Sequence, residues 1–451
     1  MIRICLFTAL TVALVWPRPS VAQNTRVLTL DEALRTARAH HPQLQVARAQ
    51  TEVANARADE GLAPLLPQVT GRAAYSRGLA DSGSGGLGIA STTTGSGTGI
   101  ATMASSGSGG VGCSSGRNCY SLGFTASQLI YDFGQTTGRW EAAKSLARAQ
   151  DNTQKRSDQE VAFNLRSAYY NAAAARALLK VAQETLTNQD AHLRQSQGFV
   201  SAGTRPEIDL AQALTNRAHA RVQLINAQNG YDVARAQLNM AMGIEGPIDY
   251  DVEAPPTEPI PGEESSTDEL LPLALKTRPD LQALAEQIHA QEATISATRG
   301  AYGPSLSANT TFSESGQAMD NMAWNWNAGL TLTWSIFGGG ITKHQVREAR
   351  ANASVLRGQY EAARQRIRLD LEQARLAVRA AKASVEATHD AVNNAREQLR
   401  LAEGRYAAGV GNVIELGDAQ VALTTASAQE VQAQFNLAVA RAQLALALGQ
   451  E

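Results

Sequence analysis

The sequence predicts a protein of mixed α and transmembrane β structure that is internally duplicated and shares one barrel among several chains. Three patterns lead to this fold class: a half-chain repeat, four stretches in which apolar and polar residues alternate, and two long proline-free runs with heptad spacing. We expect a trimeric 12-stranded β-barrel, four strands per chain (3 × 4 = 12), with long coiled-coil helical hairpins that run directly out of its strands.

The two halves of the chain share one layout. Asp31 in LDEAL matches Asp268 in TDELL, at an offset of 268 − 31 = 237, whereas Gly134 matches Gly340 at an offset of 340 − 134 = 206. The difference arises mostly from a longer Gly/Ser-rich loop in the first copy. We expect a signal peptide at 1–22 and a proline-rich and acidic connector at 244–266. The first repeat, at 23–243, is expected to contain strands at 68–77 and 118–131 and a helical hairpin at 135–243. The second repeat, at 267–451, is expected to contain strands at 305–313 and 324–336 and a helical hairpin at 341–450.

Each repeat is expected to open with a capped helix. Thr29 or Asp31 can accept hydrogen bonds from the free N–H groups of the first, and Thr267 or Asp268 from those of the second. The connector between the repeats contains too much proline to be helical throughout.

Residues 1–22 have the pattern of a secretory signal peptide. Arg3 provides the positive start, the apolar run at 4–15 is too short to span a bilayer, and residues 20–22 read Ser-Val-Ala, a small-x-small cleavage site. No run of about 18 apolar residues follows, so no transmembrane helix is expected.

Cys113 and Cys119 flank the segment SSGRN in the exported part of the chain. A close cysteine pair in an exported protein is expected to form a disulfide. The alternative, a metal site, lacks a nearby histidine or further cysteine.

Four stretches alternate as barrel strands do. In the last of them Trp324, Trp326 and Trp334 lie on one face with alanines and leucines, and Asn, Thr, Gly and Ser residues occupy the other face. In the first half the apolar face is predicted to pair Val69, Gly71, Ala73 and Tyr75 with Tyr120, Leu122, Phe124 and Ala126. Alternation over about ten residues with tryptophans near the ends favours lipid-facing strands, although a half-buried sheet in a soluble protein alternates too.

Four membrane strands cannot close a barrel by themselves. Membrane barrels need about eight strands or more, and an open edge leaves backbone groups without partners in lipid. Several chains must therefore share the barrel, and a trimer supplies an even number of strands within the known range. The loop at 78–112 is of low complexity and is expected to lie outside the barrel as a flexible segment.

The two runs at 135–203 and 341–409 contain no proline and are predicted to form very long helices. Seam positions recur every seven residues. They are Leu165, Ala172, Leu179, Leu186 and Leu193 in the first copy, and Leu371, Val378, Val385, Val392 and Leu399 in the second. A second seam follows three residues later, at Ala168, Ala175 and Ala182 and at Ala374, Ala381 and Thr388. Large residues on one seam and small ones on the other favour close coiled-coil packing.

Composition and motifs argue against several classes of function. The net charge of −2 and pI of about 6.4 do not indicate a nucleic-acid-binding surface. The 7 histidines are scattered and form no metalloprotease motif, and no nucleophile elbow is present, so neither an enzyme nor a cofactor is expected. A structural or adhesive coiled-coil protein of the outer membrane remains the alternative.

The segment at 403–420 and its counterpart near Gly203 have the features of two helical turns, with Gly203 matching Gly409 (409 − 203 = 206). With the duplication, the strand–FG–helix junctions and the motif RYAAGVGNVIELGDAQ, the chain resembles the TolC family of outer-membrane efflux proteins. The resemblance implies a homotrimer in the outer membrane with its helical barrel in the periplasm. It also implies an export duct of a tripartite efflux or type I secretion system, which docks a periplasmic adaptor at the hairpin tips and an inner-membrane transporter.

The resemblance further implies a gate at the tips. The gate tyrosine matches Tyr406 and its partner aspartate matches Asp209. The gate arginine falls on Gly411, so that link is absent, and Arg205 in the other hairpin is a conjectured substitute. An acidic ring inside the entrance matches the carboxylates Glu415 and Asp418, which would favour cations. Both could equally be ordinary acidic residues at a helix N-terminus. The exported solute and the type of partner pump stay open.

Overall fold

The computed structural model describes residues 26–77, 118–253 and 259–450. The predicted signal peptide at 1–22, the loop at 78–112 and Cys113 lie outside the described residues. The described chain forms two compact units. The hairpin unit takes its residues from 26–41, 161–253, 259–263 and 376–443; the sheet unit takes them from 42–77, 118–160, 264–375 and 444–450.

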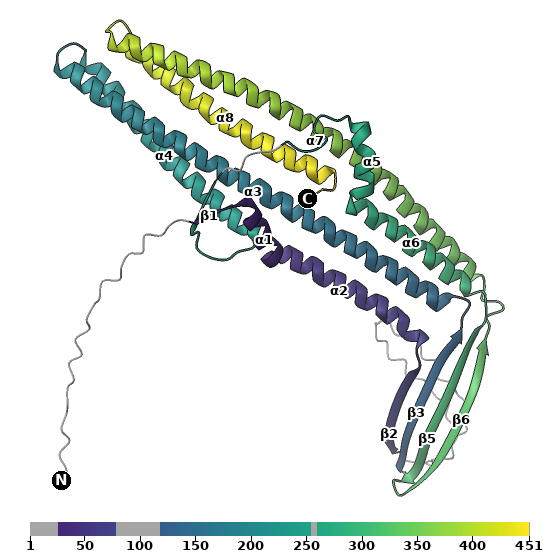
Figure 1. Ribbon diagram of the computed structural model, residues 1–451. Coiled ribbons are helices and arrows are strands. Elements are labelled where there is room, and N and C mark those ends of the chain that lie inside the picture. The colour runs from purple at the N-terminus through teal and green to yellow at the C-terminus, as the bar shows by residue number, and fades with distance from the viewer. Residues whose placement is uncertain (1–25, 78–117, 254–258, 451) are drawn as a thin grey trace, which may run out of the picture. The chain divides into compact units, whose positions relative to one another are not determined.

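Four strands of the sheet unit form one antiparallel sheet in the order β2-β3-β5-β6 (Figure 1). The strands are β2 (Gln68–Arg77), β3 (Asn118–Tyr131), β5 (Ser305–Ala318) and β6 (Asn321–Thr333). The register confirms the predicted pairing of the first repeat, with Val69 opposite Ala126 and Tyr75 opposite Tyr120. The first and second repeats meet where β3 pairs with β5, and β2 and β6 are the two edges of the sheet.

The hairpin between β5 and β6 is tighter than the sequence predicts. A loop was expected at 314–323, but pairing continues through Glu314 opposite Trp324 and reaches Ala318 opposite Asn321. Gly316 lies at an irregularity of this pairing, and a Cβ atom there would come 2.3 Å from the backbone oxygen of Asn321. Polar side chains do not prevent strand pairing, because the backbone supplies the hydrogen bonds. The last strand also ends earlier than predicted, at Thr333 rather than at 336.

One face of the sheet is apolar and uncovered. Trp324 and Leu330 of β6 are 69% and 69% exposed, and Val69 of β2 is 70% exposed. The other large apolar side chains on this face that are exposed include Tyr75, Leu122, Phe124, Phe312, Trp326 and Leu332. Exposed apolar area of this extent indicates a surface that contacts lipid or another protein.

Helices join the sheet at one end only. α2 (Pro42–Leu62), with the short η1 (Ala63–Leu65), leads into β2, and α6 (Pro279–Gly300) leads into β5. α3 (Gln135–Ser201) follows β3, and α7 (Ile341–Ala407) follows β6. α3 and α6 approach closely at Gly138, where a Cβ atom would lie 2.9 Å from that of Ala297. None of the described helices combines the length and the apolar character needed to cross a membrane.

The predicted helix caps are correct in the first repeat and wrong in the second. Thr29 caps α1 (Leu30–His40) by accepting a hydrogen bond from the Glu32 N–H. In the second repeat Ser266, rather than Thr267 or Asp268, caps α5 (Thr267–Thr277). Ser266 and Glu269 form a reciprocal capping box, and Ser266 is the counterpart of Thr29 at the repeat offset (29 + 237 = 266).

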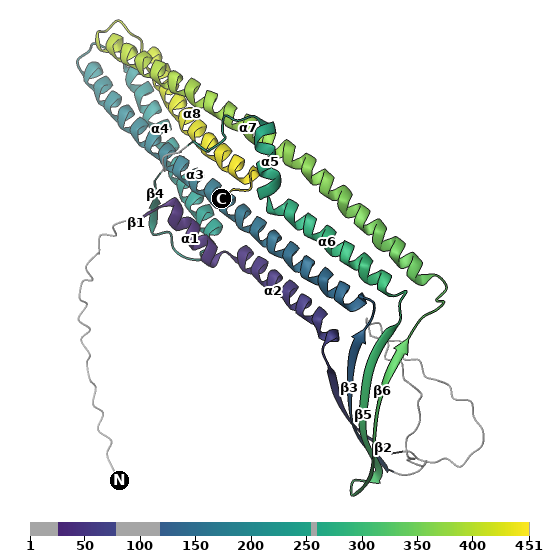
Figure 2. The same cartoon turned by 45° about the vertical axis from the view of Figure 1, so that its right-hand side comes forward.

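The hairpin unit contains the far halves of α3 and α7 together with α4 (Glu207–Met242) and α8 (Val413–Ala447) (Figure 2). All four helices end with the same motif. Gly203, Gly243, Gly409 and Gly449 have φ angles of +70°, +71°, +79° and +70°. At each, the next residue donates a backbone hydrogen bond back across the last turn, as Val410 does to Arg405. This is a Schellman ending, which favours glycine because L side chains are strained at positive φ.

A small sheet and a buried tyrosine tie the N-terminal segment to this unit. β1 (Arg26–Leu28) pairs in parallel with β4 (Tyr250–Val252). The hydroxyl of Tyr169 lies 2.9 Å from the backbone oxygens of both Leu28 and Glu253. Burial raises the pKa of this tyrosine to about 12, so it remains a neutral donor.

A buried carboxylate anchors the connector to the hairpin unit. The Glu263 side chain is 3% exposed and accepts hydrogen bonds from both Arg441 Nε (3.1 Å) and Arg441 Nη2 (3.1 Å). Lys382 Nζ lies 2.8 Å from the same carboxylate. Burial by itself would raise the pKa of Glu263, but the hydrogen bonds from Lys382 and Arg441 outweigh it, and the pKa is lowered from its usual 4.5.

We predict that Glu263→Gln destabilises the protein by about 3 kcal/mol at neutral pH, because the buried Arg441 guanidinium and the partly exposed Lys382 ammonium lose this carboxylate. A carboxyl with a lowered native pKa stabilises the fold above its unfolded-state pKa and loses that contribution as the pH falls. Thermal unfolding should therefore separate the variant from the wild type at pH 7, and the difference should shrink as the pH falls below about 4.5 toward the lowered native pKa. A difference that did not depend on pH would contradict the ion-pair explanation.

Candidate functional site at the hairpin tips

The α7–α8 turn is built around two glycines with different roles. Gly409 carries the positive φ that ends α7. Gly411 is required for close approach, because a Cβ atom there would lie 2.7 Å from the Tyr406 nitrogen. Asn412 then starts α8 by accepting from the Ile414 N–H at 3.2 Å. In this conformation the turn leaves no space for a side chain at position 411.

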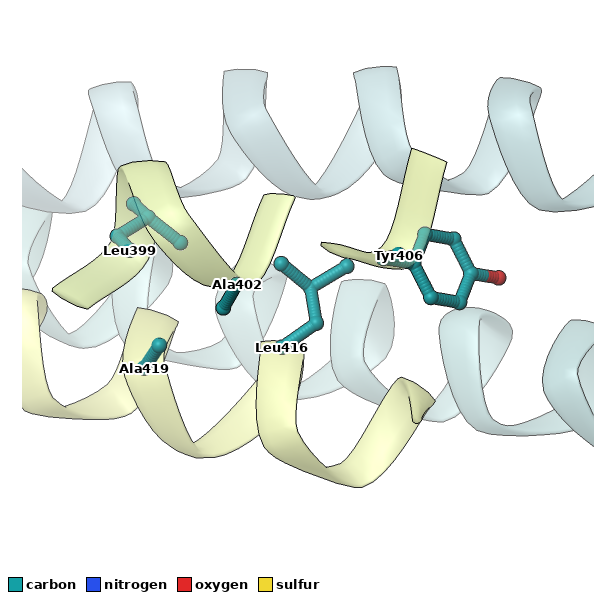
Figure 3. Close-up of a cluster of buried hydrophobic side chains, with 5 residues drawn as sticks. All are labelled: Leu399, Ala402, Tyr406, Leu416 and Ala419. Carbon is teal, nitrogen blue, oxygen red and sulfur yellow. The ribbon is translucent and has the colours of Figure 1, made fainter. Parts of the chain in front are cut away.

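Tyr406 is the centre of the apolar cluster at the tip. It is 2% exposed and packs with Leu399, Ala402, Leu416 and Ala419. Figure 3 shows Leu416 extending from α8 toward the α7 segment between Ala402 and Tyr406. A large aromatic residue buried this completely resists rotation, so the cluster holds the two arms of the hairpin together.

Tyr406 also contacts the other hairpin, on α3. Its ring meets Phe199 edge-on at a centroid distance of 6.0 Å and an interplanar angle of 61°. Its hydroxyl lies 3.3 Å from Ser196 Oγ. Asp209, the partner suggested by the family resemblance, is 5% exposed in the first turn of α4, and among the described residues its Oδ2 has no hydrogen-bond partner. Within one chain the tyrosine therefore bonds to Ser196.

Arg205 of the α3–α4 hairpin contacts Tyr406 and the turn that follows α7. Its guanidinium carbon lies 4.8 Å from the centre of the Tyr406 ring. Nη2 donates to the backbone oxygens of Gly411 (3.1 Å) and Tyr406 (3.3 Å). The cation thus stacks on an aromatic face and satisfies carbonyl groups at the C-terminal end of α7, both of which are favourable contacts. Gly203, in the same turn, ends α3 and brings the chain to Arg205.

Two buried amides connect the hairpins about two turns of α3 further from the tip than Ser196. Gln189 Nε2 donates to Gln420 Oε1 at 2.7 Å, and the two side chains are 8% and 7% exposed. Sequence reasoning missed this pair and Ser196. A signal was present, because Gln189 and Ser196 continue the small seam of Ala182 at steps of seven (182 + 7 = 189; 189 + 7 = 196). A polar residue on a buried seam indicates a specific partner on the facing helix.

Glu415 and Asp418, the two acidic residues near the start of α8, are exposed. Glu415 Oε1 lies 3.3 Å from Arg405 Nε, and both side chains are about half exposed. Asp418 lines a cavity of about 670 Å³ between α3, α4 and α8, whose walls are rich in amide and hydroxyl groups. Glu415 lies in the first turn of α8, so favourable interaction with the helix dipole and a place in an acidic ring are both compatible with its position.

The predicted disulfide falls partly outside the described residues. Cys119 at the start of β3 is disulfide-bonded. Its expected partner, Cys113, lies outside the described residues, so the pairing stays a prediction. No group of three or more His, Cys, Asp or Glu side chains that could hold a metal ion occurs among the described residues.

Comparison with known proteins agrees with the duplicated fold. The model of the outer membrane efflux protein family matches residues 33–244 and 270–450. The chain belongs to this family of channel and transport proteins, and it is accordingly a protein of the outer membrane of Gram-negative bacteria. The two matched segments coincide with the two repeats and leave out the connector.

Three relatives illustrate the similarity. The chain is 25% identical over 305 residues to the probable efflux pump outer membrane protein TtgC of Pseudomonas putida, a match that covers 66% of this chain and 62% of TtgC. It is 24% identical to the outer membrane protein TolC of Escherichia coli, covering 93% of this chain and 82% of TolC. The fold matches the crystal structure of CusC with a TM-score of 0.77 at 20% identity, over 99% of this chain and 100% of that one.

The buried amide pair can be tested by a double-mutant cycle. Gln189→Leu or Gln420→Leu alone should cost about 1–3 kcal/mol of unfolding free energy, because each leaves one buried amide without a partner. The double variant should lose little more than either single variant, since both polar groups are then replaced. Chemical unfolding of the purified protein measures all four free energies. Additive losses would show that the two amides act independently.

Proposed function

We propose that this protein is a passive export duct in the outer membrane, assembled from three copies of the chain. The observation that carries this proposal is the four-stranded sheet with two free edges and an exposed apolar face. In lipid, the N–H and C=O groups of β2 and β6 need partners, and neighbouring copies can supply them. Three copies give 3 × 4 = 12 strands, and the helices that leave one end of every sheet continue the duct as a barrel in the periplasm.

The energy for transport comes from partners in this proposal. A periplasmic adaptor docks at the hairpin tips and an inner-membrane transporter delivers the solute, which makes the protein part of a tripartite efflux or type I secretion system. The names of relatives such as the efflux pump proteins of Pseudomonas putida support efflux. A purely structural or adhesive coiled-coil protein would have no use for sheet edges that require closure. The class of solute is left open.

The hairpin tips act as the periplasmic gate of this duct. Tyr406, Ser196 and Arg205 join the α7–α8 hairpin to the α3–α4 hairpin within one copy. Asp209 has a buried oxygen without a partner in the described chain. We assign that oxygen to a donor on the neighbouring copy, which would link adjacent copies while the entrance is closed. Opening then requires the Arg205 and Tyr406 contacts to break, while the flexible turn residues Gly203 and Gly409 permit the hairpins to separate.

The purified protein should form channels in planar bilayers and run as a heat-sensitive trimer on gels. With three copies of Glu415 and Asp418 around the entrance, the channel should prefer cations. Substituting both residues, as Glu415→Gln with Asp418→Asn, should move the reversal potential in a salt gradient toward zero. Absence of both trimer and channels would refute the duct, whereas an unchanged reversal potential would refute only the acidic ring.

If these contacts close the entrance, variants that remove more of them should have higher open probabilities. Arg205→Gln removes both the stacking and the carbonyl contacts and should raise the open probability at least several-fold, as should Tyr406→Ala and Asp209→Asn. Arg205→Lys keeps the charge but not the planar fork, so its leak should be intermediate. Tyr406→Phe removes only the hydroxyl and should leak least.

Single-channel recording measures these open probabilities. Arg221→Gln, which changes an exposed arginine of α4, serves as the matched control and should behave as the wild type. Equal open probabilities for Arg205→Gln and for the control would show that the entrance closes by other contacts.

A further inference from the structure

A strongly basic cavity lies beside the junction of the sheet and the helices. It measures about 500 Å³ and is lined by Arg299 and Tyr302 from the end of α6 and by residues from the first turns of α7. The α7 residues that line it are Lys343, His344, Val346, Arg347 and Arg350. Four permanently charged side chains and one histidine thus converge on a single concave site.

These cations lack counterions of their own. Among the residues that the structure describes, none of the five basic side chains has an ion-pair partner. Glu348 belongs to the same stretch of α7 but does not line the cavity. Clustering of unneutralised cations is unfavourable because like charges repel, so the arrangement is stabilised when an anion enters.

The position of the cavity, at the end of the sheet, indicates what kind of anion it binds. Arg299 and Tyr302 precede β5, while Lys343 follows β6, and Ser305 pairs with Thr333 where these strands begin and end. The Trp334 indole donates to the backbone oxygen of Tyr302 at 3.0 Å, which joins an aromatic residue at the end of the sheet to the wall of the cavity.

Exposed apolar side chains occupy the segment between β6 and α7, next in the chain to the residues that line the cavity, and Tyr302 in the cavity wall is exposed too. Tyr302, Trp334, Ile336 and Phe337 are 55%, 58%, 82% and 89% exposed. Aromatic residues in such a position gather at the level of lipid head groups, and basic pockets next to them bind phosphate head groups. The cavity therefore combines a phosphate-binding wall with an apolar border suited to acyl chains.

The first repeat shows that the fold does not require these charges. At the offset of 206, Lys343, Arg347 and Arg350 match Thr137 (343 − 206), Glu141 (347 − 206) and Lys144 (350 − 206). Lys144 is engaged with the Trp140 ring, 4.5 Å from its centroid. The same helix start thus forms without the basic cluster, which points to a role for the cluster other than folding.

We propose that this cavity binds the phosphate head group of an anionic glycerophospholipid in the inner leaflet of the outer membrane. Arg347 and Arg350 offer planar guanidinium groups that suit phosphate oxygens, and Lys343 adds a mobile point charge. The bound lipid anchors the helical part of the chain at the membrane surface and seals the junction between sheet and helices. The inference rests on the proposed insertion of the sheet into the membrane.

The test uses native mass spectrometry of the full-length assembly in a neutral detergent. Phosphatidylglycerol is the probe, and phosphatidylcholine with the same acyl chains is its zwitterionic comparison. The wild type should retain phosphatidylglycerol preferentially. The affinity of the variant Lys343→Gln/Arg347→Gln/Arg350→Gln for phosphatidylglycerol should fall by about tenfold or more, because each cation near a lipid phosphate contributes to binding.

A matched control removes the same charge elsewhere on the same helix, as Arg366→Gln/Arg379→Gln/Arg396→Gln, and should bind phosphatidylglycerol as the wild type does. Equal weakening in the control, or no preference over phosphatidylcholine, would overturn the proposal. Displacement of the lipid by millimolar inorganic phosphate would show that the cavity binds a free anion, and it would overturn the proposal of a lipid ligand. Channel conductance of the cavity variant tests the proposed duct separately from the lipid site, because the variant should still form conducting channels whether or not it binds lipid.

Discussion

The hydrogen-bonding demand of the sheet edges is the constraint on which the rest of the molecule depends. The sheet ends at β2 and β6, and each edge presents backbone groups that lipid cannot satisfy. The proposed trimer follows from this demand, and so does the meeting of the hairpin tips around one axis. A gate made of tip residues is useful only if the copies are held together elsewhere, and the shared barrel does this in the proposed assembly.

The tips combine rigid and breakable contacts. Tyr406 is buried among residues of α7 and α8, so the two helices of this hairpin are held together as one rigid element. Its links to the other hairpin are fewer and more polar: one hydroxyl contact with Ser196 and the contacts of Arg205. Hydrogen bonds and a cation on an aromatic ring each contribute on the order of 1 kcal/mol, which a docking partner can exceed. This difference in strength is what a gate that opens on docking needs.

The sequences of the two repeats differ at the positions that form the hairpin-tip contacts and the basic cavity. The small seam of the first copy carries Gln189 and Ser196, where the second copy has Ala395 (189 + 206) and Ala402 (196 + 206). The start of α7 carries Lys343 and Arg347 in the wall of the basic cavity, where the start of α3 has Thr137 and Glu141. Duplication therefore explains the common scaffold, and the departures from it locate the sites: polar contacts at the tips and, as proposed, a lipid phosphate at the membrane surface.

Much of the scaffold could be predicted from the sequence, because alternation, heptads and glycine-terminated helices are local patterns with fixed periods. The strand pairing of Val69 with Ala126, the seam residues and the turns at Gly203 and Gly409 belong to this class. Only the tertiary structure decided that Tyr406 bonds to Ser196, 210 residues away, and that the Arg205 cation lies over its ring. Such contacts depend on which faces of distant helices meet, and no short-range period carries that information.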